Sequence, residues 1–274
     1  MTIAEKLTTI AENRQKIYDA GYARGYDDGG SEGGSGYDEG FADGKQAEYD
    51  AFWDACQVNG TRTNYRNAFA WLSWRDANFK PKYDIKPINA YSMFTNTRIS
   101  DIWGCLEIAG VVLDTSEATD MTYICSEQNY CSRIGVLDFR KATSSTGAFY
   151  YANTVETIDK IIVNENNVYT NWFGGCKIIK NITFEGVIGN NLNISGCTAL
   201  TRASIENIIN HLSDNSGGSS AKVLTLSKKA VDEAFKGGKS AADPSTTTDI
   251  GSATTDWWDL EFSASQKNWT ITLV

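Results

Sequence analysis

The sequence predicts a mainly β protein with helices (α+β), built as a solenoid between an N-terminal helical segment and a C-terminal α/β cap. Three observations support this prediction: a helical apolar seam opens the chain, an apolar repeat fills its middle, and strand and helix patterns alternate near its end. They divide the 274 residues into a helical attachment segment at 1–57, a junction at 58–98, a repeat region at 99–212 and a cap at 213–274.

The first residues have the pattern of an amphipathic helix from Thr2 to about Ala20. Thr2 and Glu5 fit a capping box. The apolar residues that follow have the three, four and seven spacing of a narrow coiled-coil seam: Ile3, Leu7, Ile10 and Ile17. One such helix is marginal alone in water, so it needs either another copy or the body of its own chain.

A row of glycines and aromatic residues follows, from Ala20 to Gly44. The aromatic residues come in pairs spaced by four, which places each pair on one helical face: Tyr22 and Tyr26, then Tyr37 and Phe41. Glycine costs about 1 kcal/mol per helical position relative to alanine, so these glycines make sense where another backbone or ring approaches closely. We expect an assembly or attachment element with a break at Asp27–Gly36 and a further helix at Gly44–Gln57. An ordinary flexible leader is the alternative.

The middle of the chain repeats the pattern small-x-x-apolar-x-x-apolar five times. The small residues are Cys105, Cys131, Ala152, Cys176 and Cys197, at intervals of 26, 21, 24 and 21 residues. The first apolar position holds Ile108, Ile134, Val155, Ile179 and Leu200, and the second holds Val111, Leu137, Ile158, Ile182 and Ala203. Periods of this length are typical of solenoids. Each coil offers a short β segment (VVLD, VLDF, KIIV or NITF), and an irregular first coil is expected around residues 90–94.

The repeat also gives the cysteines a role. They have no CxxC spacing and the single histidine, His211, has no cysteine near it, so neither a zinc site nor any other metal site is expected. Ala152 takes the position that cysteine holds elsewhere, and a free cysteine behaves as a small hydrophobic residue. We therefore expect the five small side chains to line up in one dry column.

The C-terminal part alternates helix and strand patterns. An amphipathic helix is predicted from about Ser204 to Leu212, where it caps the last coil. A strand at Val223–Leu226, a short helix in LSKKAVDEAFKGG and a final strand in NWTITLV follow, and the two strands are expected to pair. The polar run from Ser240 to Asp256 predicts a loop.

Composition excludes several classes of function. The formal net charge is −9 and the pI is about 4.7, which disfavours non-specific binding to nucleic acid or to an anionic membrane. No run of about 18 apolar residues predicts a transmembrane helix, and the N-terminus lacks the pattern of a secretory signal peptide. We expect synthesis in a cytoplasm. No P-loop or dinucleotide fingerprint is present, and no cofactor is expected.

Catalysis has one candidate pair of residues, Asp138 and Asp159. They occupy equivalent places in successive predicted coils, so stacking could bring them close together, and a carboxylate pair on a groove is the machinery of glycan cleavage. The equivalent positions later in the chain are Thr183 and Ser204, so the position favours a polar residue in general. We predict a non-catalytic protein.

Binding residues are expected on the edges of the coils, because extended faces of repeats make large contact surfaces. Aromatic and amide side chains suit contact with sugars or proteins at small entropic cost. The candidates for such a contact surface are Tyr130, Tyr151, Tyr169, Trp172, Asn191, Trp257 and Trp258.

Several motifs together resemble proteins encoded by tailed phages and prophages of Gram-positive gut bacteria. They are GYARGY, YDEGFADGKQAEYDAFWDACQ, the segment RTNYRNAFAWLSWRDANFKPKYDIKP (Arg62–Pro87), the repeats, and the ending with SIENIINHLSD, VLTL and NWTITLV. The resemblance implies irregular leucine-rich repeats and a virion structural protein of the tail fibre, tip or baseplate. It also implies a homo-oligomer, most simply a trimer, that contacts other tail proteins and a host-surface glycan or protein. The sequence departs from the family pattern near residues 240–258.

Two other functions stay open. A depolymerase of cell-surface glycans would require a carboxylate pair in an open groove. A bacterial surface adhesin would require secretion, and neither a signal peptide nor a C-terminal anchor is visible in the sequence.

Overall fold

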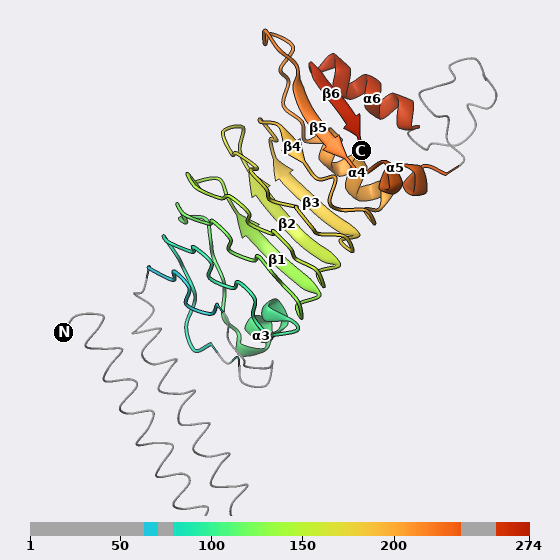
Figure 1. Cartoon of the computed structure of the whole chain (residues 1–274). Coiled ribbons are helices and arrows are strands. Elements are labelled where there is room, and N and C mark those ends of the chain that lie inside the picture. Colours follow the sequence, from blue (N-terminus) through green and yellow to red (C-terminus); the bar gives the residue numbers. More distant parts are fainter. Residues whose placement is uncertain (1–62, 71–78, 80, 237–255) are drawn as a thin grey trace, which may run out of the picture.

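The computed structural model describes residues 63–70, 79, 81–236 and 256–274. In these ranges the chain forms an elongated stack that ends at the C-terminus in a group of helices (Figure 1). The elements are, in order, α3 (Ile102–Ala109), β1 (Arg133–Asp138), β2 (Thr157–Val163), β3 (Asn181–Gly186), β4 (Leu192–Asn193), α4 (Arg202–Asn210), β5 (Lys222–Leu226), α5 (Lys228–Ala234), α6 (Trp257–Gln266) and β6 (Trp269–Leu273).

All the strands pair in parallel, in two separate three-stranded sheets. One sheet has the order β1-β2-β3 and the other β4-β5-β6. In the first sheet Ile134, Ile158 and Ile182 lie side by side, so each turn of the chain takes 24 residues there. Before β1 the described turns are joined by isolated parallel bridges: one links Ile85 to Leu113, and a separate row links Asn64, Asn89, Asp120 and Ser144. These early turns are therefore stacked without regular strands.

The predicted fold class, a mainly β protein built as an irregular leucine-rich-repeat solenoid between an N-terminal helical segment and a C-terminal α/β cap, is wrong. The described residues form two small parallel sheets and four helices. The first predicted coil, CLEIAGV, lies largely in helix α3, because Asp101 caps the N-terminus by accepting a hydrogen bond from the Gly104 amide (2.8 Å). A spacing of three suits one face of a helix as well as a coil corner. Ile108, assigned to the first apolar column, is 90% exposed.

The predicted column of five small residues is also wrong. Ile134 pairs with Ile158, although the sequence pattern placed them in different columns, so Cys131 is not level with Ala152. Ala203 at the last coil is exposed on α4. The small side chains are nevertheless core residues: Cys105, Cys131, Ala152, Cys176 and Cys197 are all buried, and the described cysteines carry free thiols. Burial raises the pKa of the thiols of Cys125 and Cys197, which keeps them protonated.

Secondary-structure predictions fared better after Cys131. The segments VLDF, KIIV and NITF lie wholly or largely in β1, β2 and β3, whereas VVLD contributes only an isolated bridge at Leu113. Helix α4 begins two residues before its predicted start, and β5 and β6 pair as expected, in parallel. Helix α6 was not predicted, although Asp256 and Asp259 form a capping box at its N-terminus.

Opposite the strands the chain runs through a second layer, which we call the arches: residues 91–96, 122–127, 146–151 and 170–175. Each arch has two residues of positive φ four positions apart: Ser92 and Asn96, Tyr123 and Glu127, Gly147 and Tyr151, and Asn171 and Gly175. Backbone bonds join successive arches, such as Phe94 N–H to Ile124 C=O (2.9 Å) and Phe149 N–H to Trp172 C=O (3.1 Å). The arches therefore form a second ladder parallel to the sheet.

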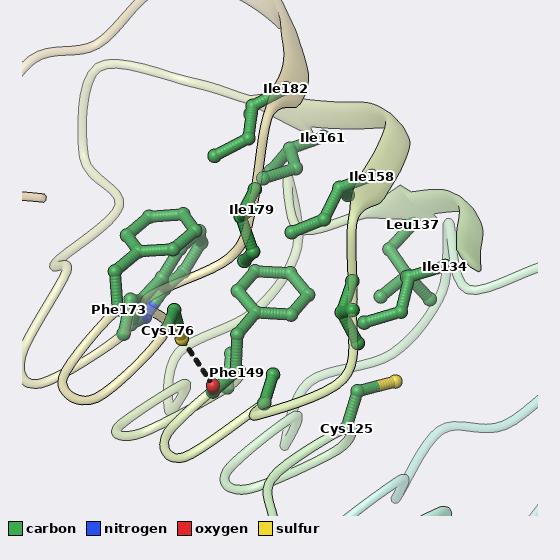
Figure 2. Close-up of a cluster of buried hydrophobic side chains, with 14 of the residues drawn as sticks. Cys125, Ile134, Leu137, Phe149, Ile158, Ile161, Phe173, Cys176, Ile179 and Ile182 are labelled. Carbon is green, nitrogen blue, oxygen red and sulfur yellow. Dashed lines mark hydrogen bonds between the residues drawn. The ribbon is translucent and has the colours of Figure 1, made fainter. Parts of the chain in front are cut away.

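The core lies between the strands and the arches. Figure 2 shows Ile134, Ile158 and Ile182 from the strands facing Phe149 and Phe173 from the arches. Phe149 stacks on Phe173 with ring centroids 5.3 Å apart. The Cys176 thiol donates to the Phe149 carbonyl (2.9 Å), so it ties one arch to the next.

Residues 63–70, in the predicted junction, already belong to this stack. Tyr65 and Phe69 are fully buried, and the Phe69 amide donates to the Met93 carbonyl (2.9 Å). The attachment segment 1–57 lies outside the described residues, and with it the predicted oligomer contacts Ile3, Leu7, Ile10, Ile17, Tyr22, Tyr26, Tyr37 and Phe41. Among the described helices, none has the length and apolar character needed to cross a membrane.

Candidate binding edge

The predicted contact residues divide into exposed and buried groups. Tyr130, Tyr151 and Trp258 are 50%, 47% and 52% exposed, and Asn191 is exposed as well. Tyr169, Trp172 and Trp257 are buried, so their assignment to a binding surface is wrong.

Packing explains the buried group. Trp172 lies 4.5 Å from Phe139 and 4.9 Å from Tyr169 between ring centroids, inside the core. The ring of Trp257, the first residue of α6, packs with its centroid 5.4 Å from that of Phe235. Residue type alone did not separate these rings from the exposed ones, because large aromatic side chains serve cores and contact surfaces equally.

Four tyrosines gather on the outer side of three successive arches, and we call them the tyrosine cluster: Tyr91, Tyr123, Tyr150 and Tyr151. Tyr91 and Tyr123 stand perpendicular with centroids 6.2 Å apart, and Tyr150 and Tyr151 do so at 4.4 Å. The Arg66 guanidinium lies over the Tyr91 ring at 3.7 Å. Only Tyr151 was predicted as a contact.

Three of these rings lie against a glycine of the next turn. A Cβ on Gly147 would come within 2.3 Å of the Tyr123 ring, one on Gly174 within 2.8 Å of the Tyr150 ring, and one on Gly175 within 2.6 Å of the Tyr151 ring. Each glycine follows its tyrosine by one 24-residue turn of the stack. Its missing side chain leaves the space that the ring occupies, so a side chain at that glycine would collide with the ring.

Contacts within the cluster raise the pKa of Tyr150. The largest cause is the hydrogen bond with the Tyr151 hydroxyl, followed by the charge of Tyr151, desolvation, and the charges of Tyr123 and Glu127. Tyr150 therefore stays neutral at physiological pH, and its hydroxyl can donate as well as accept a hydrogen bond.

A hollow of about 440 Å³ lies beside this cluster. Its lining combines rings, hydroxyl groups and two charges: Arg66, Asn67, Ala70, Tyr91, Ser92, Thr95, Tyr123, Ser126 and Glu127. Thr95 donates to the Tyr123 carbonyl (2.8 Å) and contacts the Ser126 hydroxyl (3.1 Å), so these hydroxyls stabilise the floor. Within the described part of the chain, neither the Arg66 guanidinium nor the Glu127 carboxylate forms an ion pair.

Farther along the same side of the stack is a second hollow of about 550 Å³. Two predicted contacts line it, the exposed Asn191 and the largely buried Tyr169, together with Asn171, Asn190, Asn193 and Lys222. Most of these polar groups already have partners: Asn191 accepts from the Val223 amide (2.8 Å), Asn190 donates to the Asn167 carbonyl (3.0 Å), and Lys222 donates to the Gly189 carbonyl. This hollow therefore offers a ligand fewer free groups than the first.

Charges on the strand side of the molecule are paired instead of free. Ion pairs join one turn to the next, as between Lys180 and Glu156 (2.7 Å) and between Arg133 and both Glu107 (3.2 Å) and Asp159 (2.6 Å). The hydrogen bond to Asp159 is the largest cause of the raised pKa of Arg133. These paired charges stabilise the stack. They are therefore less available to a ligand than the charges of Arg66 and Glu127 at the first hollow.

The candidate carboxylate pair is not brought together. Asp138 is level with Ile162 in the sheet, so Asp138 and Asp159 do not hold equivalent positions. Asp138 accepts hydrogen bonds from the Arg140 amide (2.9 Å) and guanidinium (2.6 Å), and Asp159 accepts from Arg133. In the described ranges no cluster of His, Cys, Asp and Glu side chains has the arrangement of a metal site.

Comparisons with protein-family models, curated proteins and solved structures find no match to this chain. The family resemblance therefore rests on the sequence motifs alone and stays a prediction.

Proposed function

We propose that this chain is a non-catalytic structural protein of a phage tail, in the fibre, tip or baseplate, and that it attaches the particle to the host surface. The proposal assigns anchoring to residues 1–57 and surface contact to the outer side of the arches. It includes self-association as a homo-oligomer, most simply a trimer.

The observation that carries the attachment role is the tyrosine cluster. Tyr91 pairs with Tyr123 and Tyr150 pairs with Tyr151, on successive arches that backbone hydrogen bonds join. Aromatic side chains on rigid supports are the usual anchors of binding surfaces, because little entropy is lost when they are covered. Support for a place in the virion comes from the sequence motifs, and support for self-association comes from the apolar seam of Ile3, Leu7, Ile10 and Ile17.

The location is tested by labelling particles made by the strain that carries the gene with antibody raised against residues 63–274. Label at the tail end in negative-stain images is expected, and a chain that lacks residues 1–57 should no longer enter the particle. Absence of the protein from purified particles contradicts the proposal.

The attachment role is tested separately by adding purified full-length protein to host cells before infection. Adsorption of particles should fall as the sites on the cells fill. If particles adsorb equally well to cells saturated with the purified protein, the protein does not attach the particle to the cell, and only a structural role in the tail is left for it.

A further inference from the structure

We propose that the hollow between Arg66, Tyr91, Tyr123 and Glu127 is a carbohydrate-binding site that takes a sugar ring of a cell-surface glycan. This inference deepens the proposed attachment function and rests on it. The hollow has a volume of about 440 Å³, which falls within the range of roughly 300–1,000 Å³ that small-molecule sites have.

The charges of the hollow favour a neutral, polyhydroxylated ligand. Arg66 and Glu127 bring one positive and one negative group, so the net charge of the lining is zero. A phosphate or another polyanion would meet Glu127 unfavourably. A hydroxyl donates to a carboxylate and accepts from a guanidinium, and hydrogen bonds of this kind to charged groups are the stronger ones.

The rings supply the second half of sugar recognition. Tyr91 and Tyr123 stand at 89° to each other and are both partly exposed, so they form two walls of the hollow. A sugar ring has an apolar C–H face and a polar rim. The face suits a tyrosine ring, and the rim suits Arg66, Glu127 and the phenol hydroxyls.

The walls are rigid before binding. Gly147 supports the Tyr123 ring, and Arg66 lies on the Tyr91 ring at 3.7 Å. Backbone bonds fix the spacing of the arches: Asn67 N–H to Tyr91 C=O (2.9 Å) and Ser92 N–H to Thr122 C=O (2.8 Å). Pre-organised groups lose less entropy on binding, so a shallow site can still be specific.

The site also continues in one direction. Tyr150 and Tyr151 lie on the next arch beyond Tyr123, and neighbouring parallel chains are about 4.8 Å apart. A glycan chain that lies along the stack would therefore leave the hollow over Tyr123 and meet Tyr150 and Tyr151. This geometry favours a polymer over a free monosaccharide.

The experiment uses the full-length protein on an array of immobilised neutral and acidic oligosaccharides, with Tyr91→Ala and Glu127→Gln as test variants. Phe262→Ala and Glu261→Gln on α6 are matched controls, since Phe262 is an exposed ring far along the chain from the hollow. Each test variant should bind neutral glycans at least about tenfold more weakly, as expected for loss of a hydrogen bond to a charged group or of a stacking ring. The controls should stay within about twofold, and unchanged thermal unfolding shows that the variants fold.

A second arm uses Gram-positive cells to which the wild-type protein binds. Periodate treatment of the cells, which destroys sugars, should abolish retention, and protease treatment should not. Equal retention of Tyr91→Ala, Glu127→Gln and wild type overturns the carbohydrate site but leaves the attachment function intact. Retention that protease removes and periodate spares identifies a protein receptor and also overturns the inference, as does a wild type that binds no neutral glycan on the array.

Discussion

The strand side and the arch side of the stack have the same parallel backbone ladder but carry different surfaces. On the strand side, exposed charges pair between turns, as Lys180 does with Glu156. On the arch side the surface includes tyrosines, and within the described ranges the guanidinium of Arg66 and the carboxylate of Glu127 form no ion pair. The comparison indicates that surface chemistry, rather than backbone, separates the side that stabilises this fold from the side that is available to bind.

The contrast between the strand side and the arch side holds only if strands and arches pack on one common hydrophobic core. Phe149→Ala, in an arch, should lower the free energy of unfolding by about 3–5 kcal/mol, as truncation of a fully buried ring does. Val136→Ala on the strand side removes a half-exposed side chain and should cost no more than about 0.5 kcal/mol. Urea unfolding measures both. A loss below 1 kcal/mol for Phe149→Ala would mean that the arches are a loosely attached layer.

The glycine beneath Tyr123 gives the next largest effect. Gly147→Ala should cost about 3 kcal/mol, because the new methyl group strains a backbone with φ of +63° and also collides with the ring. It should weaken binding at the hollow too.

Two other glycines separate the causes. Gly110→Ala has the same positive φ but open space, so it should cost only about 1–2 kcal/mol. Gly217→Ala has open space and no such φ, and it should be nearly neutral. Urea unfolding measures the free energy of unfolding of each variant. Equal losses for Gly147→Ala and Gly110→Ala would show that the packing of the Tyr123 ring does not depend on Gly147.

Charge changes should sharpen the contrast between the two sides. Glu156→Gln breaks an exposed ion pair on the strand side and should cost less than about 1 kcal/mol, decreasing further at high salt, with no effect on ligand binding. Glu127→Gln should do the reverse, leaving stability unchanged and weakening binding. Thermal unfolding at low and high salt, combined with the array, distinguishes them. If Glu156→Gln lost glycan binding, the strand side would also contribute to binding, and the two sides would no longer differ in function.

The smallest effect concerns acid. Hydrogen bonds from the side chain and amide of Ser116 lower the pKa of Asp114 below its usual value of 3.8. Its folded-state pKa is therefore below its unfolded one, so the stabilisation is present above about pH 4 and is lost as the pH falls through the folded value. Asp114→Asn keeps the turn but cannot titrate. Urea unfolding at several pH values should show that the free energy of unfolding falls slightly less steeply with decreasing pH for the variant than for the wild type. An identical pH dependence would contradict a stabilising role of the Asp114 carboxylate.

Local patterns accounted for much of the secondary structure. The apolar β-branched runs in β2 and β3, the helical spacing in α4 and the strand pattern of β5 each specify their element within a few residues. Helix α3 was missed because small-x-x-apolar also fits a helix face. The alignment of the turns was missed because cysteine or alanine fills more than one buried position per turn, so matching small residues did not give the true 24-residue step.

The candidate site depended more on the tertiary structure. Tyr151 was predicted, but Arg66, Tyr91, Tyr123 and Glu127 come from three different turns and meet only because the turns stack. A signal did exist in the sequence: a glycine follows Tyr123, Tyr150 and Tyr151 by one 24-residue turn in each case. It becomes readable only when the length of a turn is known.

Within the described residues, the sequence by itself determined which segments after Cys131 are mostly strands or helices, and that the cysteines there are core residues. Both follow from apolar spacing and side-chain size, which act over a few neighbouring positions. Only the tertiary structure decided the step between turns, the split into two sheets and the meeting of Arg66, Tyr91, Tyr123 and Glu127. These depend on backbone bonds between residues far apart in the sequence, such as Ser92 to Thr122 and Phe149 to Trp172, whose partners are chosen by packing of the whole core.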